Sequence, residues 1–184
     1  MKITLESFEQ IYKDNCQLVY NLALHYVQNS EDAEEITQDV FIKIHQSLST
    51  FHNKSNLKTW IYRITINTSL DFIKMKNSKK RIFIFGNKNQ NKNEYLKTSN
   101  FEHPGILMEN QENAKILFDA IHTLTENQKT AFLLSKLEGL SNPEIATIMN
   151  LSISAVESLI FRGKATLREK LEKKFIEYHK KKKY

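Results

Sequence analysis

The chain has 184 residues, with 4 glycines, 2 prolines and a formal net charge of +6. This length provides one medium hydrophobic core or two small ones, which excludes a large multidomain enzyme. Because tight turns need glycine and proline, the composition disfavours β-sandwiches and barrels, and we expect an all-α protein.

The sequence carries no pattern typical of export, of a membrane span or of a catalytic centre. Cys16 is the single cysteine, which excludes an intramolecular disulfide and a cysteine-rich metal site. The most apolar stretch, residues 18–27, is far shorter than the roughly 20 residues that cross a bilayer, and no apolar signal segment follows Met1. The six histidines are scattered, without a phosphate loop or nucleophile motif. We expect a cytoplasmic protein, not an enzyme, with no membrane span, metal or cofactor.

Helical periodicity fails over residues 79–112, which include the turn signal His103-Pro104-Gly105 and read as a flexible linker. On either side, apolar residues return at helical spacing, which predicts two small helical domains at residues 1–78 and 113–175. A Lys-rich tail follows at 176–184, and five of the six net positive charges lie beyond the linker. This distribution favours a polyanion such as DNA as a partner, although a bare lysine run also fits a solubilising tail.

The first domain is expected to hold three amphipathic helices. The first ends before Asn29, the second begins near Ser30 with that residue as its N-cap, and the third covers about residues 56–76. The apolar face of the first helix consists of Phe8, Ile11, Tyr12, Val19, Leu22, Ala23, Tyr26 and Val27. The second is expected to bury Ala33, Ile36, Val40, Phe41, Ile44 and Leu48.

The second domain is expected to hold four helices. Residues 125–128 have the form of a capping box that opens the second of them, which ends at Gly139, and residues 141–144 form another that opens the third. Asn150 ends the third helix and suits a left-handed turn, which costs most residues ~1 kcal/mol or more. Ala146 is small enough for two helices to cross closely, so the last two helices are predicted to form a helix-turn-helix. The residues expected to hold it together are Ile145, Met149, Leu151, Val156 and Leu159 or Ile160.

The second helix of this motif, about residues 152–170, should turn small and polar side chains outward, as a helix entering a DNA major groove does. This face is predicted to consist of Ser154, Ala155, Glu157, Ser158, Phe161 and Arg162, with Arg162, Lys164 and Arg168 suited to phosphates. Glu157 has two interpretations: it accepts a hydrogen bond from a cytosine amino group, or it closes a capping box with Ser154. A plain amphipathic helical hairpin is the alternative to a DNA-binding motif.

Two surfaces of the first domain indicate partners. Acidic residues gather on its second helix: Glu31, Asp32, Glu34, Glu35 and Asp39. Such a surface repels DNA and should meet a protein or a metal, although a solvated helix face is the plain alternative. Trp60 lies near Lys58 and Arg63, a combination suited to unstacked bases, but a lone tryptophan is more often a core residue.

Taken together, three segments resemble the extracytoplasmic-function (ECF) sigma factors of bacterial RNA polymerase. They are residues 32–44 (DAEEITQDVFIKI), 57–67 (LKTWIYRITIN) and 155–162 (AVESLIFR). The resemblance spans nearly the whole chain and implies that the first domain is sigma region 2 and the second sigma region 4. It also implies promoter-specific transcription initiation without catalysis by this chain.

The resemblance further implies partners and roles for individual residues. The family binds core polymerase through the β′ coiled coil and the β flap, and the positions that match its region 2 docking surface are Glu35, Gln38, Asp39 and Phe41. The positions that match capture of a flipped base from the melted −10 strand are Trp60, Arg63 and Asn67, with Asn53 and Asn56 in the loop lining the pocket. The recognition helix would bind double-stranded −35 DNA, and many relatives also bind an anti-sigma protein.

The chain departs from the family pattern at three positions. Ile61 stands where primary sigma factors place a second tryptophan, Glu157 where the family has Lys or Arg, and Gly163 where it has Ala. A glycine inside a helix costs ~1 kcal/mol relative to alanine, so Gly163 is expected to mark a bend. Two other functions stay open on the sequence: a helix-turn-helix regulator with a sensing or dimerising first domain, and a carboxylate metal enzyme built on residues 31–39.

Overall fold

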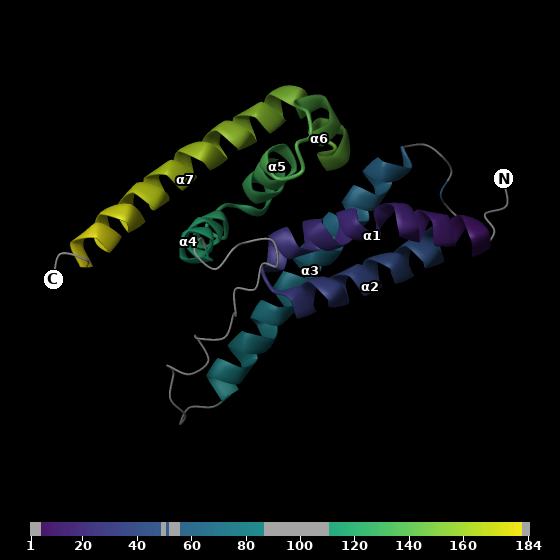
Figure 1. Cartoon of the computed structure of the whole chain (residues 1–184), viewed down its shortest axis with the longest axis horizontal. Helices are drawn as coiled ribbons and strands as arrows, with labels where there is room; N and C mark the ends of the chain where they lie inside the picture. Colours follow the sequence, from purple (N-terminus) through teal and green to yellow (C-terminus); the bar gives the residue numbers. More distant parts are fainter. Residues whose placement is uncertain (1–4, 49–50, 52–55, 87–110, 182–184) are drawn as a thin grey trace. The chain divides into compact units, whose positions relative to one another are not determined.

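The structure is a computed structural model that describes residues 5–48, 51, 56–86 and 111–181. Within these ranges the secondary structure consists of helices and turns without strands, which confirms the all-α prediction (Figure 1). The helices are α1 (Leu5–Val27), α2 (Ser30–Ser47), α3 (Leu57–Gly86), α4 (Gln111–Ile121), α5 (Glu126–Lys136), α6 (Asn142–Met149) and α7 (Ile153–Lys181). The chain divides into two compact units, Met1–His103 and Pro104–Tyr184.

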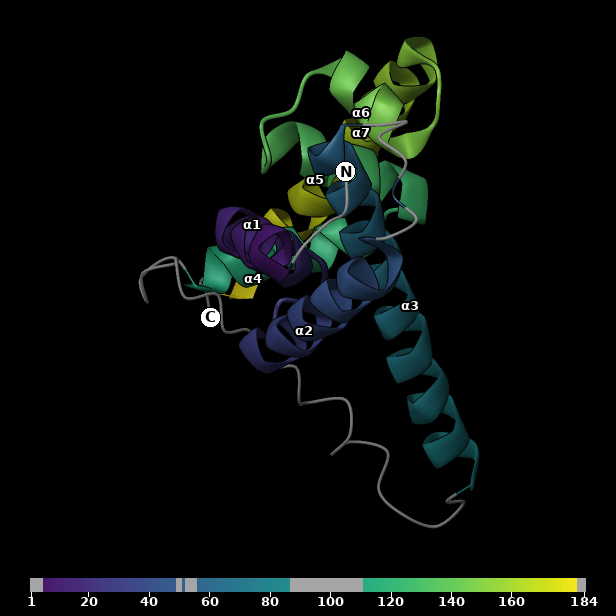
Figure 2. The same ribbon diagram turned by 90° about the vertical axis from the view of Figure 1, so that its right-hand side faces the viewer.

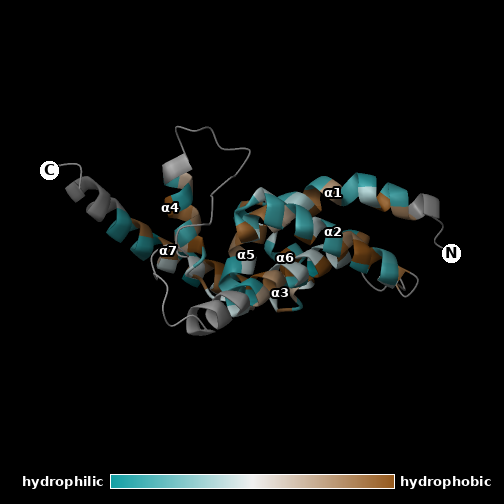
Figure 3. Cartoon of the chain, turned by 90° about the horizontal axis from the view of Figure 1, so that it is seen from below, coloured by the Kyte–Doolittle hydropathy of each residue, from teal (hydrophilic) through white to brown (hydrophobic). Residues whose placement is uncertain are grey.

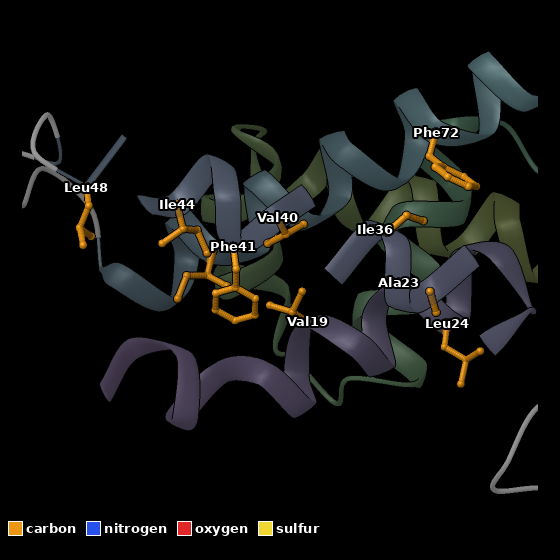
Figure 4. Close-up of a cluster of buried hydrophobic side chains, with 11 residues drawn as sticks. Val19, Ala23, Leu24, Ile36, Val40, Phe41, Ile44, Leu48 and Phe72 are labelled. Atoms are coloured by element: carbon orange, nitrogen blue, oxygen red, sulfur yellow. The ribbon is translucent and has the colours of Figure 1, made fainter. Parts of the chain in front are cut away.

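In the first unit, α1, α2 and α3 contact one another around one hydrophobic core. Figure 4 shows Val19 of α1 beside Phe41 of α2, and both are buried. All six residues predicted to be buried on the second helix are buried. Burying one large aliphatic or aromatic side chain contributes ~1.5–3 kcal/mol, so this shared core fixes how α2 and α3 present their outer faces.

The turn between α1 and α2 depends on Gln28 and Asn29. Gln28 has φ 57°, a left-handed conformation that is uncommon for a residue other than glycine, and its side-chain amide donates to two carbonyl groups of α1 at 2.8 and 3.1 Å. The Asn29 side chain then accepts a hydrogen bond from the backbone N of Asp32 at 2.8 Å and caps α2. The prediction of Ser30 as the cap is therefore wrong, because Ser30 is already the first helical residue.

α3 continues ten residues beyond the predicted end at residue 76, so residues 79–86 are helical rather than linker. The amphipathic spacing is lost in this segment, but no glycine or proline occurs before Gly86. Because no helix-breaking residue is present, the helix continues. The C-terminal part of α3 extends past α1 and α2 (Figure 2). Lys76 Nζ donates to the Asp32 carboxylate and so joins α3 to the first turn of α2.

In the second unit, α7 contacts α4, α5 and α6. Its buried hydrophobic residues include Phe118, Ile121, Leu133, Leu134, Ile145, Val156, Ile160 and Leu167, and the helices carry hydrophobic and hydrophilic residues on different sides (Figure 3). The predicted capping box at α5 is confirmed by the Thr125 N to Gln128 Oε1 and Gln128 N to Thr125 Oγ1 hydrogen bonds of 3.3 and 3.4 Å. α5 ends at Lys136, three residues before Gly139, which has φ +69°.

Candidate nucleic-acid interface

The second unit contains the predicted helix-turn-helix. α6 and α7 are separated by a short break and bend by 102°, within the range of helix-turn-helix motifs. Asn150 has φ 55° and ψ 48°, and its backbone N–H donates to the Ala146 carbonyl. The Ser152 hydroxyl accepts from the backbone N of Ala155 at 3.2 Å, which satisfies one of the donors that a helix N-terminus leaves without a helical partner.

The residues that hold this motif together differ in part from the prediction. Ala146, Val156 and Ile160 are buried as expected. Leu151, however, is 38% exposed, and Ile148 is buried in the place expected for Met149. Leu151 lies in the turn before α7 begins at Ile153, so helical spacing did not apply to it.

The outer face of α7 carries the side chains predicted to enter the major groove. Most of them are exposed and Ala155 is half-buried; the exposed ones are Ser154, Glu157, Ser158, Phe161, Arg162 and Lys164. Four of these line one surface hollow: Glu157, Ser158, Phe161 and Arg162. The Arg162 guanidinium donates through Nε to the Ser158 carbonyl at 3.2 Å, which holds a positive charge at this face.

The structure excludes one of the two interpretations of Glu157. Ser154 lies inside α7, one residue after its start, and its hydroxyl pairs with that of Ser152 at 3.1 Å. A capping box with Ser154 is therefore excluded, because the N-cap position belongs to Ser152. Glu157 Oε1 instead accepts a long hydrogen bond from Asn142 Nδ2 of α6, at 3.4 Å.

α7 continues through Gly163 as one helix from Ile153 to Lys181, so this glycine does not end the helix. Gly163 is buried, and a Cβ added there would lie 3.8 Å from Gln128 Cβ and 3.9 Å from Leu124 Cδ1. Gly163 therefore marks the place where α7 passes close to the start of α5.

A buried lysine lies on the inner side of the second unit. Lys129 is 6% exposed, and its Nζ lies 3.2 Å from His122 Nδ1. Burial lowers the pKa of Lys129 to about 8. His122 is exposed overall, but burial around its ring, together with the charge of Lys129, lowers its pKa to about 4. At neutral pH His122 is therefore neutral and accepts from the lysine.

In the first unit, α2 presents the predicted acidic surface. Glu35, Gln38 and Asp39 are exposed, on the side away from buried Ile36 and Val40. Their spacing of three and four residues places them on one side of the helix.

Phe41 is buried as a core residue, whereas the neighbouring Ile42 is exposed. Phe41 is 5% exposed, and its ring contacts those of Tyr12 and Phe8 with centroids 4.7 and 6.5 Å apart. The prediction that Phe41 belongs to the docking surface is therefore corrected: it supports that surface from the core. Ile42 was not predicted, yet it is 53% exposed and follows Gln38 by one turn. An apolar residue at a position where the helical period requires a surface residue was the available signal.

Trp60, Arg63 and Asn67 follow one another along α3 at intervals of three and four residues. Asn67 is exposed, whereas Trp60 and Arg63 are half-buried. The Trp60 ring lies over Phe51, with centroids 4.8 Å apart and planes inclined by 33°, and it also borders the hydrophobic core. Trp60 is thus part core residue and part surface.

The loop before α3 is described in part. The exposed Asn56 uses Oδ1 to accept from the backbone N of Lys58 at 3.0 Å, which caps the start of α3. Asn53 lies outside the described residues.

Neither a metal centre nor a membrane helix is found in the parts of the chain that the structure describes. Among those residues no group of three or more His, Cys, Asp and Glu side chains could hold a metal ion. No single helix there is long and apolar enough to cross a membrane, and only α6 with the first part of α7 reaches that length and composition as a bent pair.

Comparison with known proteins gives matches in both units. Residues 11–79 match Sigma-70 region 2, and residues 114–167 match Sigma-70, region 4. The ECF RNA polymerase sigma-E factor of Haemophilus influenzae is 32% identical over 157 residues, which cover 84% of this chain and 82% of the relative. The ECF RNA polymerase sigma-E factor of Escherichia coli K12 is 31% identical over 163 residues, with 84% and 81% covered.

Solved structures share the fold. CnrH, in complex with the cytosolic domain of CnrY, has a TM-score of 0.64 at 19% identity, covering 92% of this chain and 90% of its own. The sigma factor RpoE of Bartonella quintana, in complex with the anti-sigma factor NepR, has a TM-score of 0.65 at 20% identity, covering 91% and 98%. With the sequence matches, these findings show that the chain belongs to the ECF sigma factors of bacterial RNA polymerase and directs promoter-specific transcription initiation.

Proposed function

We propose that three helices divide the work of initiation: α2 binds core polymerase, α3 holds melted −10 DNA, and α7 reads the −35 element. On this proposal the first unit acts as region 2 and the residues from 113 to 175 as region 4, with catalysis left to the polymerase. The observation that carries the proposal is the polar and basic outer face of α7, presented by a helix-turn-helix in a chain that also matches region 2.

Core polymerase is proposed to bind the exposed side of α2 through its β′ coiled coil. Glu35, Gln38 and Asp39 supply hydrogen-bond acceptors and negative charge there, and the exposed Ile42 supplies an apolar contact at the same side. Interfaces combine an apolar centre with a polar rim, and this group of four provides both. Lys76 pairs with Asp32 at the start of α2, so the docking surface lies beyond the first turn.

Melted −10 DNA is proposed to lie along α3. Base capture needs an aromatic face for stacking, worth ~1–3 kcal/mol per base, and polar groups that recognise the flipped base. Trp60 offers part of its ring, and Asn67 lies exposed two turns further on. Asn56, which caps α3, is placed where the pocket loop joins the helix, and Asn53 is proposed for the same loop. The buried Ile61 leaves Trp60 as the stacking residue of this segment.

Double-stranded −35 DNA is proposed to receive α7 in its major groove. Ser154, Ser158 and Arg162 are exposed there, and phosphate contacts by Arg and Lys position such a helix while base contacts specify sequence. The second unit is also proposed to bind the β flap.

The cellular setting of the protein follows from this role. We place it in the cytoplasm, where it meets polymerase and DNA. An anti-sigma protein is proposed as a further partner. The RpoE structure contains the anti-sigma factor NepR, and the CnrH structure contains the cytosolic domain of CnrY, each bound to a chain of the same fold.

The experiment that tests this proposal is transcription in vitro. Purified core polymerase is supplied with the full chain and a library of promoters randomised at both elements. We expect transcripts that start at defined positions and share a −35 and a −10 sequence. Transcripts no more specific than those of core polymerase alone would refute the proposal.

A further inference from the structure

Phe161 is an unusual surface residue. It is 75% exposed, more than the other exposed large hydrophobic side chains in the described part of the chain. It is not needed for packing, because Val156, Ile160 and Leu167 hold α7 on its other side. An exposed aromatic ring gains free energy when an apolar group covers it, so this ring is suited to an apolar group on the partner of this face.

Glu157 is exposed, lies one turn before Phe161 and lines the same hollow. Its Oε1 accepts a long hydrogen bond from Asn142 Nδ2 of α6, at 3.4 Å. A carboxylate has two oxygens with about four acceptor sites, so this one hydrogen bond leaves capacity for a donor on the partner. Arg162 lines the same hollow as Glu157. Its positive charge offsets the repulsion between the Glu157 carboxylate and the DNA phosphates.

The two side chains are close enough on α7 to reach neighbouring base pairs. Residues four apart on a helix are separated by ~6 Å along its axis, whereas stacked base pairs are separated by ~3.4 Å. With α7 placed in the major groove as proposed, this separation brings Glu157 and Phe161 to base pairs within about two steps of each other. In the major groove, the C5 methyl of thymine is the apolar group that contacts Phe, and the N4 amino group of cytosine is the donor that pairs with Glu.

We propose that Glu157 and Phe161 select a cytosine and a thymine within two base pairs of each other in the −35 element. The Glu157 carboxylate accepts from the cytosine N4 amino group, and the Phe161 ring contacts the thymine methyl. This inference rests on the proposed placement of α7 in the −35 major groove and adds the bases it recognises.

The test first finds the element and then removes single groups from it. Holoenzyme made from the full chain and core polymerase selects −35 sequences from a randomised library, and the selected duplex is resynthesised with each thymine replaced in turn by deoxyuridine. Deoxyuridine lacks only the methyl group. At one thymine, this replacement should weaken binding of the wild-type holoenzyme to the duplex about fourfold, the effect of losing one buried methyl-sized group. The same replacement should not change the binding of holoenzyme that contains Phe161→Ala.

Two further variants complete the design. Glu157→Ala should lose the preference for cytosine at one position while it keeps the sensitivity to the thymine methyl. Leu117→Ala removes another exposed apolar side chain, on α4, and serves as the matched control that keeps both preferences. Phe161 and Glu157 are exposed, so both variants should fold, which circular dichroism checks.

Four outcomes overturn the inference. A selected element without a methyl-sensitive thymine removes the role of Phe161, as does a Phe161→Ala variant that still distinguishes thymine from deoxyuridine. Loss of core polymerase binding in Phe161→Ala would show that the ring contacts protein instead. If no −35 sequence is selected at all, the proposed function fails together with this inference.

Discussion

Replacing Gly163 by alanine tests how closely α7 packs on α5. A Cβ at this position would lie 3.8 Å from the Cβ and carbonyl oxygen of Gln128 and 3.9 Å from Leu124 Cδ1, which are ordinary van der Waals distances. Alanine therefore fits without displacing a neighbour, and it removes the helix-propensity cost of glycine, ~1 kcal/mol. We expect Gly163→Ala to raise the unfolding free energy of the second unit by about 1 kcal/mol, a rise in Tm of roughly 4–8 °C.

Gly139→Ala is the matched control, because nothing lies within 4 Å of a Cβ added there but its φ is +69°. A left-handed conformation costs an L-residue ~1–2 kcal/mol, so this variant should lose stability. The assay is thermal unfolding of the full chain. Its single tryptophan, Trp60, lies in the first unit, so fluorescence follows that unit, and a circular dichroism transition without a fluorescence change belongs to the second. A transition that Gly163→Ala leaves unchanged or lowers would refute the reasoning.

Three other variants test individual contacts. Arg162→Ala should weaken −35 binding and reduce the salt dependence of log K by about one unit, as measured by anisotropy titrations at several salt concentrations; an unchanged slope would place this guanidinium away from phosphate. As the pH falls from about 6.5 to about 4, the second unit should lose stability, because burial and Lys129 lower the pKa of His122 to about 4 and only the unfolded chain then takes up the proton. The His122→Gln variant should not show the part of this stability loss that comes from His122, on the order of 1 kcal/mol after solvent screening. Denaturant titrations of both proteins at pH 7 and 4.5 measure the loss in unfolding free energy; equal losses in the two proteins would contradict the prediction. Trp60→Ala should reduce the permanganate reactivity of −10 thymines without weakening core binding, whereas Trp60→Phe should retain part of it; full reactivity in Trp60→Ala would argue against stacking.

The helices and their cores were largely predictable because their apolar residues recur at helical spacing. Val40 and Ile44 of α2 and Val156 of α7 are buried as that spacing required. Periodicity describes only the inside of a regular helix, which is why it failed at the ends. Leu151 lies in a turn and is exposed, and α3 continued beyond residue 76 because loss of amphipathic spacing does not by itself break a helix.

The candidate sites were predictable as surfaces but not as single contacts. Residue type and spacing placed Glu35, Gln38 and Asp39 on one exposed side of α2. The same reasoning could not show that Phe41 packs under the aromatic residues of α1, because that contact joins helices far apart in the sequence. Nor could it show that Asn142 contacts Glu157, since this hydrogen bond depends on how α6 crosses α7.

Binding of the full chain to bacterial core polymerase tests the account most directly. Gel filtration of the mixture should show a stable complex for the wild type, and no complex for a variant with Glu35, Gln38 and Asp39 replaced by alanine. Because these side chains are exposed, circular dichroism should show the same helical content in both proteins. A wild-type chain that elutes apart from core polymerase, or a triple variant that binds as well as the wild type, would contradict the account.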